Sequence, residues 1–300
     1  MNGRSVYCKN NFMDNGKTIE ILGVKVDCLT LPQALQVVNG LAVDGQNHYI
    51  VTPNPEMVMY SLAHPEFREL LNHASLSLVD GFGLVWAAKY LSLPLTAKPI
   101  LRNLQEWWQF AWTSLAIVLA PKTLNIIPER LTGADMVWEI AKLASECGYS
   151  VFLLGGQPGV ALTAGNLIQQ MYPQLQLAGA VAGPPYDTMD TVISHLQLSR
   201  PKFIFLALPA NQQMDWIETE LPKLSGAIVM GIGGALDFIT GATALNAPVA
   251  KSPAKRAPEW WQRHGLEWLW RFLTQPWRRQ RIKVATVDFM QEVRKHRDVL

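Results

Sequence analysis

Thr52, Asn54 and Asp80 are the first side chains in the chain whose types and positions suit ligand chemistry. Apolar runs at residues 49–52 and 76–79 each read as a short strand, and the three side chains lie where those strands end. In an open α/β sheet, ligands bind at the carboxyl ends of the strands. These residues therefore predict a ligand site with one carboxylate in it. Asx residues also favour helix caps, so the sequence leaves open that Asn54 and Asp80 only cap helices.

Two glycine-rich turns could bring backbone close to the same ligand. Gly155 and Gly156 follow an apolar run at residues 150–154, a pattern like the start of a nucleotide-binding half, although packing alone could require it. Gly231-Ile-Gly-Gly-Ala-Leu-Asp237 includes Gly233 and Gly234 and offers N–H groups for a phosphate. The sequence contains no Asp-x-Asp and its cysteines lack metal-ligand spacing, so we expect no metal site.

Positive charge is concentrated at the end of the chain. Residues 251–300 carry a net charge of +7 against −5 for residues 1–250, and they hold five of the eleven tryptophans. Basic residues interleaved with tryptophan indicate either nucleic acid or an anionic membrane surface. No known nucleic-acid-binding module accompanies them, so we expect no nucleic-acid partner.

Arg271, Arg278 and Arg281 are the cations in this region whose spacing suits a ligand. They are seven and three residues apart and share one helical face if the helix continues across Pro276. Guanidinium groups match phosphate oxygens in a bidentate way and so suit a diphosphate. The alternative is a solvated charged face, which the surrounding tryptophans make less favourable.

Strands alternate with helices over most of the chain and predict the fold. Residues 18–242 read as a Rossmann-like α/β domain, a doubly wound and mostly parallel sheet with right-handed crossovers. A polar, flexible arm is expected at residues 1–17, a loop at 243–258 and a basic helical appendage at 259–300. Within this outline we expect a hairpin at 18–29, helices at 32–42 (capped by Thr30), 259–273 and from Pro276 to about 297, and a helix at 55–73 with Met57, Tyr60, Leu62 and Leu70 inward.

An amphipathic segment at about residues 97–127 interrupts the alternation. It has no charge between residues 107 and 121, which is too short to span a bilayer, since spanning takes about 20 apolar residues. Lys98, Arg102 and Lys122 flank it. The segment is either a helix lying on a membrane surface or a helix packed on the protein, and the sequence leaves both open.

Several motifs, taken in order over about residues 18–285, resemble the WecG/TagA/CpsF glycosyltransferases. They are Thr52-Pro-Asn-Pro-Glu56, Asp80-Gly-Phe-Gly83, Glu129-Arg-Leu-Thr-Gly133, Leu154-Gly-Gly156, Gln213 with Trp216, Gly231-x-Gly-Gly-x-x-Asp237, and the stretch from Lys255 through Arg271 to Pro276. The resemblance implies transfer of an N-acetylmannosamine-type sugar from a UDP donor to a polyprenyl-diphosphate-linked glycan. It further implies inversion at the anomeric centre, no cofactor or metal, and a peripheral place on the cytoplasmic face of the plasma membrane during cell-surface polysaccharide synthesis.

The resemblance also implies roles for single residues. Asp80 would be the general base toward the acceptor hydroxyl, and Thr52, Asn54, Arg130 and Gln213 would position the sugar and acceptor. The glycines of the two turns and Asp237 would lie against the donor. Arg271, Arg278 and Arg281 would close over the diphosphate and offset the leaving-group charge.

The chain departs from the family pattern in three places. Asn211-Gln-Gln-Met214 lacks the expected lysine and glutamate, and the segments at 97–127 and 243–253 are longer than expected. We interpret the first long segment as extra membrane attachment. Two other functions stay open: a non-catalytic nucleotide-sugar-binding scaffold at the membrane, and an NAD-dependent sugar-nucleotide oxidoreductase, although Gly-x-Gly-x-x-Gly and Tyr-x-x-x-Lys are missing. The sequence also leaves a homo-oligomer open.

Overall fold

A six-stranded parallel sheet forms the centre of the molecule. The structure is a computed structural model that describes residues 17–96, 98–241, 257–258, 260–261 and 266–297, so the arm at 1–17 and the loop at 243–258 fall almost wholly outside it. The sheet order is β4-β3-β8-β7-β5-β6, and β1 and β2 form a separate antiparallel pair. The strands are β1 (Thr18–Ile21), β2 (Val24–Asp27), β3 (His48–Val51), β4 (Leu76–Ser77), β5 (Ser150–Gly155), β6 (Gln176–Val181), β7 (Phe203–Ala207) and β8 (Ile228–Gly231). The predicted α/β class is confirmed.

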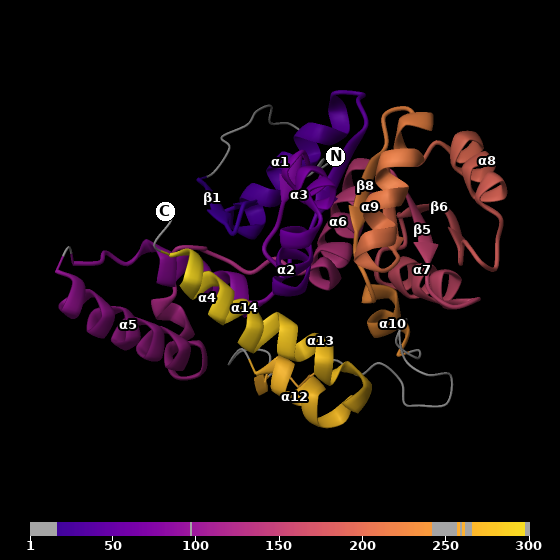
Figure 1. The fold of residues 1–300 in the computed structure, drawn as a ribbon. Helices are drawn as coiled ribbons and strands as arrows, with labels where there is room; N and C mark the ends of the chain where they lie inside the picture. Colours follow the sequence, from indigo (N-terminus) through magenta and orange to yellow (C-terminus); the bar gives the residue numbers. More distant parts are fainter. Residues whose placement is uncertain (1–16, 97, 242–256, 259, 262–265, 298–300) are drawn as a thin grey trace.

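Helices cover both faces of this sheet, as the doubly wound prediction requires (Figure 1). Alternate side chains of β5 are buried on opposite faces of the sheet: Val151 and Leu153 lie in one apolar core, and Phe152 and Leu154 lie in the other. Both faces are apolar and therefore need a cover of helices. One core contains buried side chains of α1 (Leu31–Val43), α6 (Gly133–Cys147), α7 (Val160–Met171) and α10 (Ala235–Thr240). The other contains those of α2 (Pro55–Ala63), α3 (Pro65–Asn72), α4 (Phe82–Ser92), α8 (Met189–Ser199) and α9 (Ala210–Thr219).

Local sequence signals set several helix ends. Thr30 begins α1 with a capping box, in which Gln33 Oε1 accepts from the Thr30 backbone N–H at 2.9 Å. Thr132 begins α6, and Gly148 ends it in the left-handed conformation that glycine adopts without strain.

The predicted helix at residues 55–73 is wrong as a single element. It is two helices, α2 and α3, separated at His64 because Pro65 lacks a donor and keeps His64 (φ −132°, ψ 85°) out of the helical region. Tyr60 faces outward instead of inward and stacks on His64, with 3.8 Å between the ring centroids. Met57 is buried as expected.

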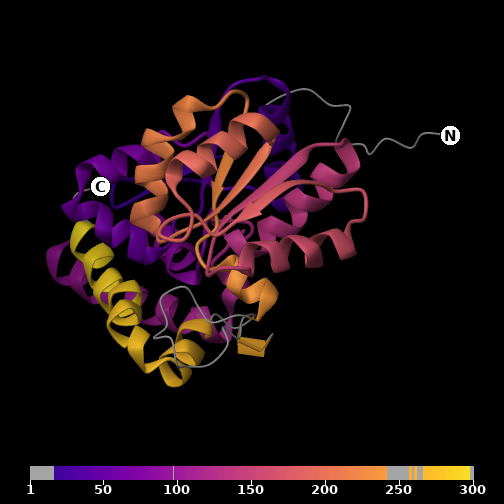
Figure 2. The same cartoon turned by 90° about the vertical axis from the view of Figure 1, so that its right-hand side faces the viewer.

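The C-terminal residues 266–297, called the tail below, lie across the side of the molecule toward which the strands point (Figure 2). The tail contains α12 (Glu267–Thr274), a 3₁₀ turn (Pro276–Arg278), α13 (Arg279–Lys283), a π-helical turn (Val284–Asp288) and α14 (Phe289–His296). The helix predicted at 259–273 lies partly outside the described residues. Phe289 and Val293 are fully buried in the core that also holds α2 and α4, so apolar packing docks the tail.

The long helix α5 (Pro99–Leu119) accounts for most of the segment at 97–127. It lies beside α4 at one end of the molecule, next to the C-terminal end of the tail (Figure 1). In the part of the chain that the structure describes, no helix combines the length and apolarity that crossing a bilayer requires.

Removing the buried aromatic ring of the tail should release the tail without unfolding the sheet. Phe289→Ala loses a fully buried ring of the core, and such a truncation costs about 3–5 kcal/mol. We expect limited proteolysis to cut residues 266–297 much faster in this variant than in the parent. Val287→Ala, at a half-exposed site on the same segment, is the matched control. Equal cleavage of the two variants would contradict this role for Phe289.

Candidate active site

Thr52, Asn54 and Asp80 lie at the carboxyl ends of β3 and β4, which are neighbours in the sheet. The Asp80 backbone N–H donates to the Pro53 carbonyl oxygen at 2.9 Å, so the two strand ends are held together. The structure therefore brings these three residues to one place, as the sequence predicts.

Asn54 and Asp80 differ in how they use their side chains. Asn54 caps α2, because its Oδ1 accepts from the Met57 N–H at 3.0 Å. Asp80 is not the cap of α4, since Gly81 occupies the N-cap position with φ 100°. Asp80 is half-buried, so the one carboxylate predicted for the site remains accessible there.

Arg130 lies beside the same loop. Its guanidinium carbon is 4.9 Å from the centre of the Phe82 ring, a cation–π contact, and Phe82 is the first residue of α4. The next backbone N–H, that of Leu131, donates to the Val79 carbonyl oxygen at 3.1 Å. Phe82 and Val79 lie two residues after and one residue before Asp80 in the sequence, so these contacts hold Arg130 near Asp80, as the predicted site requires.

The turn after β8 lies beside the carboxyl end of β3, at the same edge of the sheet. Thr52 Oγ1 donates to the Gly231 carbonyl oxygen at 3.3 Å and so joins the end of β3 to this turn. Gly234 and Asp237 follow, and a side chain at Gly234 would lie 3.4 Å from Asp237 Oδ2. Gly233 has φ +51° and open space where a Cβ would be. The turn therefore presents bare backbone toward the edge.

Gln213 has a structural task in this arrangement. It is buried, its Nε2 donates to the Leu208 carbonyl oxygen at 2.7 Å, and its Oε1 packs so closely on Gly231 that any Cβ at Gly231 would collide with it. Asn211 and Gln212, beside it in the changed segment, are exposed. Any contact of Gln213 with a sugar stays a prediction.

Arginines of the tail lie near the carboxyl ends of β3 and β8. Burial, and then the nearby charges of Arg271 and Arg281, lower the pKa of Arg278 to about 10. Glu56 and Asp237 act on Arg278 in the opposite direction. Arg271 and Arg281 therefore each lie near enough to Arg278 to repel it, and Glu56 after β3 and Asp237 after β8 lie near enough to attract it.

The three arginines do not share one continuous helix. The helix does not continue across Pro276, although the predicted common face of the arginines required it to. Residue 275 and a 3₁₀ turn separate α12 from α13, because Pro276 cannot continue a helix. The chain bends there, and the bend rather than a helical stripe gathers the charges. Arg271 also lies 5.4 Å from the centre of the Phe238 ring on α10.

A bidentate ion pair fastens the tail to the start of α2. Arg281 Nε and Nη2 donate to Glu56 Oε1 and Oε2 at 2.7 and 3.1 Å. Glu56, Phe82 and Phe238 are the residues that sequence reasoning did not assign to the site. Each lies next to or within a motif that it singled out, and that proximity is the signal that could have found them.

Gly155 and Gly156 lie apart from this group. Strand β5 is four positions from β4 and two positions from β8 in the sheet, or about 19 Å and about 10 Å at about 4.8 Å per strand. At Gly155 (φ +116°) a Cβ would collide with the Ala207 carbonyl on β7, so packing of neighbouring strands requires this glycine. Within the described residues, His, Cys, Asp and Glu form no group of three that could hold a metal ion.

Proteins of known activity resemble this chain over nearly its whole length. An enzyme from Staphylococcus aureus (strain NCTC 8325 / PS 47), named N-acetylglucosaminyldiphosphoundecaprenol N-acetyl-beta-D-mannosaminyltransferase, is 28% identical over 283 residues, which is 94% of each chain. The proteins of the same name from strains COL and MSSA476 match to the same extent.

The family comparison covers the described fold and all the residues discussed above. The sequence profile of the glycosyl transferase WecG/TagA/CpsF family matches residues 19–102 and 100–298. These matches span the sheet, the strand ends that carry Asp80 and Thr52, and the tail with its arginines. The chain therefore belongs to the WecG/TagA/CpsF family of glycosyltransferases.

Proposed function

We propose that the chain transfers an N-acetylhexosamine-type sugar, similar to N-acetylmannosamine, from a UDP donor to a polyprenyl-diphosphate-linked glycan. Family membership and the relatives' printed name support the class of sugar and a diphosphate-lipid acceptor. The product would enter cell-surface polysaccharide synthesis. The family match gives no support to an NAD-dependent oxidoreductase.

The observation that carries this proposal is a group of three arginines near the strand ends that also carry Asp80. Arg271 and Arg281 both lie near enough to Arg278 to act on its charge. Arg281 pairs with Glu56 just after β3, and Asp80 follows the adjoining strand β4. A set of crowded cations is stabilised by an anion with several oxygens, and a diphosphate fits that description. The arrangement thus supports a donor whose diphosphate lies under the tail and whose sugar faces Asp80.

The proposed reaction is a single displacement that needs no metal. The Asp80 carboxylate takes the proton of the acceptor hydroxyl, and the hydroxyl oxygen forms a bond to the anomeric carbon. The bond from that carbon to the donor phosphate oxygen breaks on the opposite side, which inverts the configuration. UDP leaves with an added negative charge, which the arginines stabilise in the way that metal ions do elsewhere.

The other assigned residues have supporting roles in this proposal. Arg130 and Asn54 lie near Asp80 and would contact the sugar or acceptor, while the backbone of the turn at residues 231–234 would approach the donor. Thr52 would act mainly by holding that turn through the Gly231 carbonyl. Because the acceptor is lipid-linked, we place the enzyme on the cytoplasmic face of the plasma membrane as a peripheral protein.

Neutralising Arg278 should weaken binding of a diphosphate. A hydrogen bond to a charged group contributes about 1.5–3 kcal/mol, so Arg278→Gln should weaken inorganic pyrophosphate and UDP roughly 10- to 100-fold. We expect both ligands to raise the Tm of the parent protein and to raise that of the variant much less. Arg279→Gln, at the exposed neighbouring position, removes the same charge as a control. Equal losses in both variants would contradict the proposed diphosphate contact.

Replacing the proposed base should separate donor binding from transfer. Asp80→Asn keeps the size of the side chain but cannot take a proton, so we expect turnover to fall about 10²- to 10⁴-fold. The readout is UDP release from candidate UDP-sugars with a lipid-diphosphate acceptor, together with donor binding by thermal shift. Asp215→Asn, at an exposed site on α9, is the control.

Two results would count against this function. Near-normal turnover of Asp80→Asn would remove Asp80 from the base role. Donor binding by the parent protein without transfer to any lipid-diphosphate acceptor would favour the non-catalytic scaffold instead.

A further inference from the structure

Helix α5 buries the polar side chains of Glu106, Gln109 and Thr113 on its inner side and exposes large apolar side chains on its outer side. Glu106 is only 9% exposed and Thr113 is fully buried, whereas Leu104 is 70% and Trp108 64% exposed. A surface helix of a globular protein shows the opposite pattern, with its polar side in water. The outer side of α5 is therefore not built to face water.

Contacts on the inner side fix the rotation of α5 about its axis. Trp86 Nε1 donates to Thr113 Oγ1 at 3.0 Å, and Phe110 packs edge-on against the Trp86 ring, with 5.6 Å between the ring centroids. Glu106 Oε1 accepts from Arg294 Nε at 2.6 Å. Turning the outer side inward would break a largely buried ion pair, which is strongly destabilising. The apolar outer side is thus a fixed feature of the surface.

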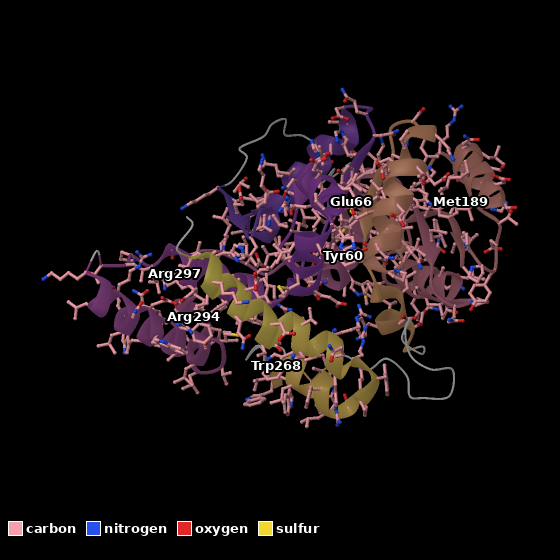
Figure 3. All side chains as sticks on the ribbon, viewed as in Figure 1. Tyr60, Glu66, Met189, Trp268, Arg294 and Arg297 are labelled. Carbon is pink, nitrogen blue, oxygen red and sulfur yellow. The ribbon has the colours of Figure 1, made fainter. Side chains whose placement is uncertain are left out.

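The tail makes the ion pair with Glu106 and adds further contacts to α5. Arg294 lies over the Trp107 ring at 3.6 Å as well as pairing with Glu106, and Arg297 donates to Gln109 Oε1 and to the Leu93 carbonyl oxygen. Figure 3 shows both arginines where α14 adjoins α5. The helix that presents the apolar surface therefore also holds the end of the tail.

The outer side of α5 forms one long apolar stripe with cations at its ends. Its exposed members are spaced three, four, seven and four residues apart, which keeps them on one side of the helix, and are Leu101, Leu104, Trp108, Leu115 and Leu119. Leu101, Leu104 and Trp108 also line a shallow hollow of about 550 Å³ with Thr96 and Gln105. Lys98 before the helix and Lys122 after it are exposed. Tryptophan and leucine between terminal cations are typical of helices that lie in the interface of anionic lipids.

We infer that the outer side of α5 is a docking surface for an anionic lipid bilayer, in which the helix lies flat. The use of this surface rests on the proposed function, because docking would bring the site to a lipid-linked acceptor. The evidence for the surface itself comes from α5 alone. Trp268 and Leu273 of α12 are also exposed, and α12 lies on the same lower side of the molecule as α5 (Figures 1 and 3). Docking through α5 would set the tail, and with it Arg271, Arg278 and Arg281, close to the bilayer surface.

Vesicle binding of a variant with a polar outer side tests this inference. Leu104→Gln, Trp108→Gln and Leu115→Gln combined change three exposed side chains and none of the contacts that Glu106, Gln109, Phe110 and Thr113 make to α4 and the tail. The matched control combines Leu162→Gln, Met171→Gln and Leu198→Gln, which are equally exposed on α7 and α8. Co-sedimentation with vesicles of phosphatidylglycerol and phosphatidylcholine gives the affinity, and thermal melts confirm that both variants are folded.

We expect the parent and the control to bind these vesicles and the α5 variant to bind at least about 100-fold more weakly, since about 1.4 kcal/mol is tenfold in affinity. A second variant, Lys98→Gln with Lys122→Gln, should weaken binding to the anionic vesicles and leave binding to pure phosphatidylcholine vesicles unchanged.

Unchanged vesicle binding of the α5 variant would overturn the inference. So would a variant that binds vesicles normally but has a smaller mass than the parent in sedimentation velocity, because the stripe would then join two copies of the chain. Vesicle binding requires no sugar transfer. A failure of α5 docking is therefore distinguishable from a failure of the transferase proposal, which would leave vesicle binding intact and abolish UDP release.

Discussion

The docking of the tail across the strand ends is the interaction on which the site depends. The bidentate pair between Arg281 and Glu56 sets its orientation, but both side chains are partly exposed and such a pair contributes only about 0–1 kcal/mol. Stability comes instead from the buried side chains of Phe289 and Val293, which pack into the core that holds α2 and α4. Apolar burial thus holds charged groups where charge alone would not hold them.

Placing three arginines near one another costs electrostatic free energy, which appears as a lowered pKa of Arg278. Arg278 is partly buried and lies near Arg271 and Arg281, and for these reasons its pKa falls to about 10 while it stays protonated at neutral pH. An anion bound beside these arginines would relieve this repulsion. In the proposed reaction the same preorganised charges stabilise UDP as it leaves, because they are already in place when its negative charge develops.

Much of the fold could be predicted because its signals are local. Thr30 with Gln33 predicts a helix start, and the alternation of apolar runs with helical segments predicts a parallel sheet whose carboxyl ends carry Thr52 and Asp80. The break at Pro65 was also a local signal, but the apolar pattern on both sides of it favoured one long helix. The position of β8 between β3 and β7 depends on the packing of the whole sheet, and no local pattern encodes it.

The candidate site was predictable in its parts and not in its assembly. The arginines were identified by spacing along a continuous helix, whereas a bend at Pro276 brings them together. The pairing of Arg294 with Glu106 joins residues 188 positions apart, and nothing near either residue in the sequence indicates the other. Gly155 was assigned to a ligand because of its motif, but the contact with Ala207 shows that strand packing is enough to require it.

A crystal structure of the chain with a bound UDP-sugar would test the central claim most directly. The account predicts that the diphosphate oxygens accept hydrogen bonds from Arg271, Arg278 and Arg281, with the anomeric carbon of the sugar facing Asp80. A diphosphate bound at Gly155 and Gly156, with the tail arginines turned away from it, would contradict the account.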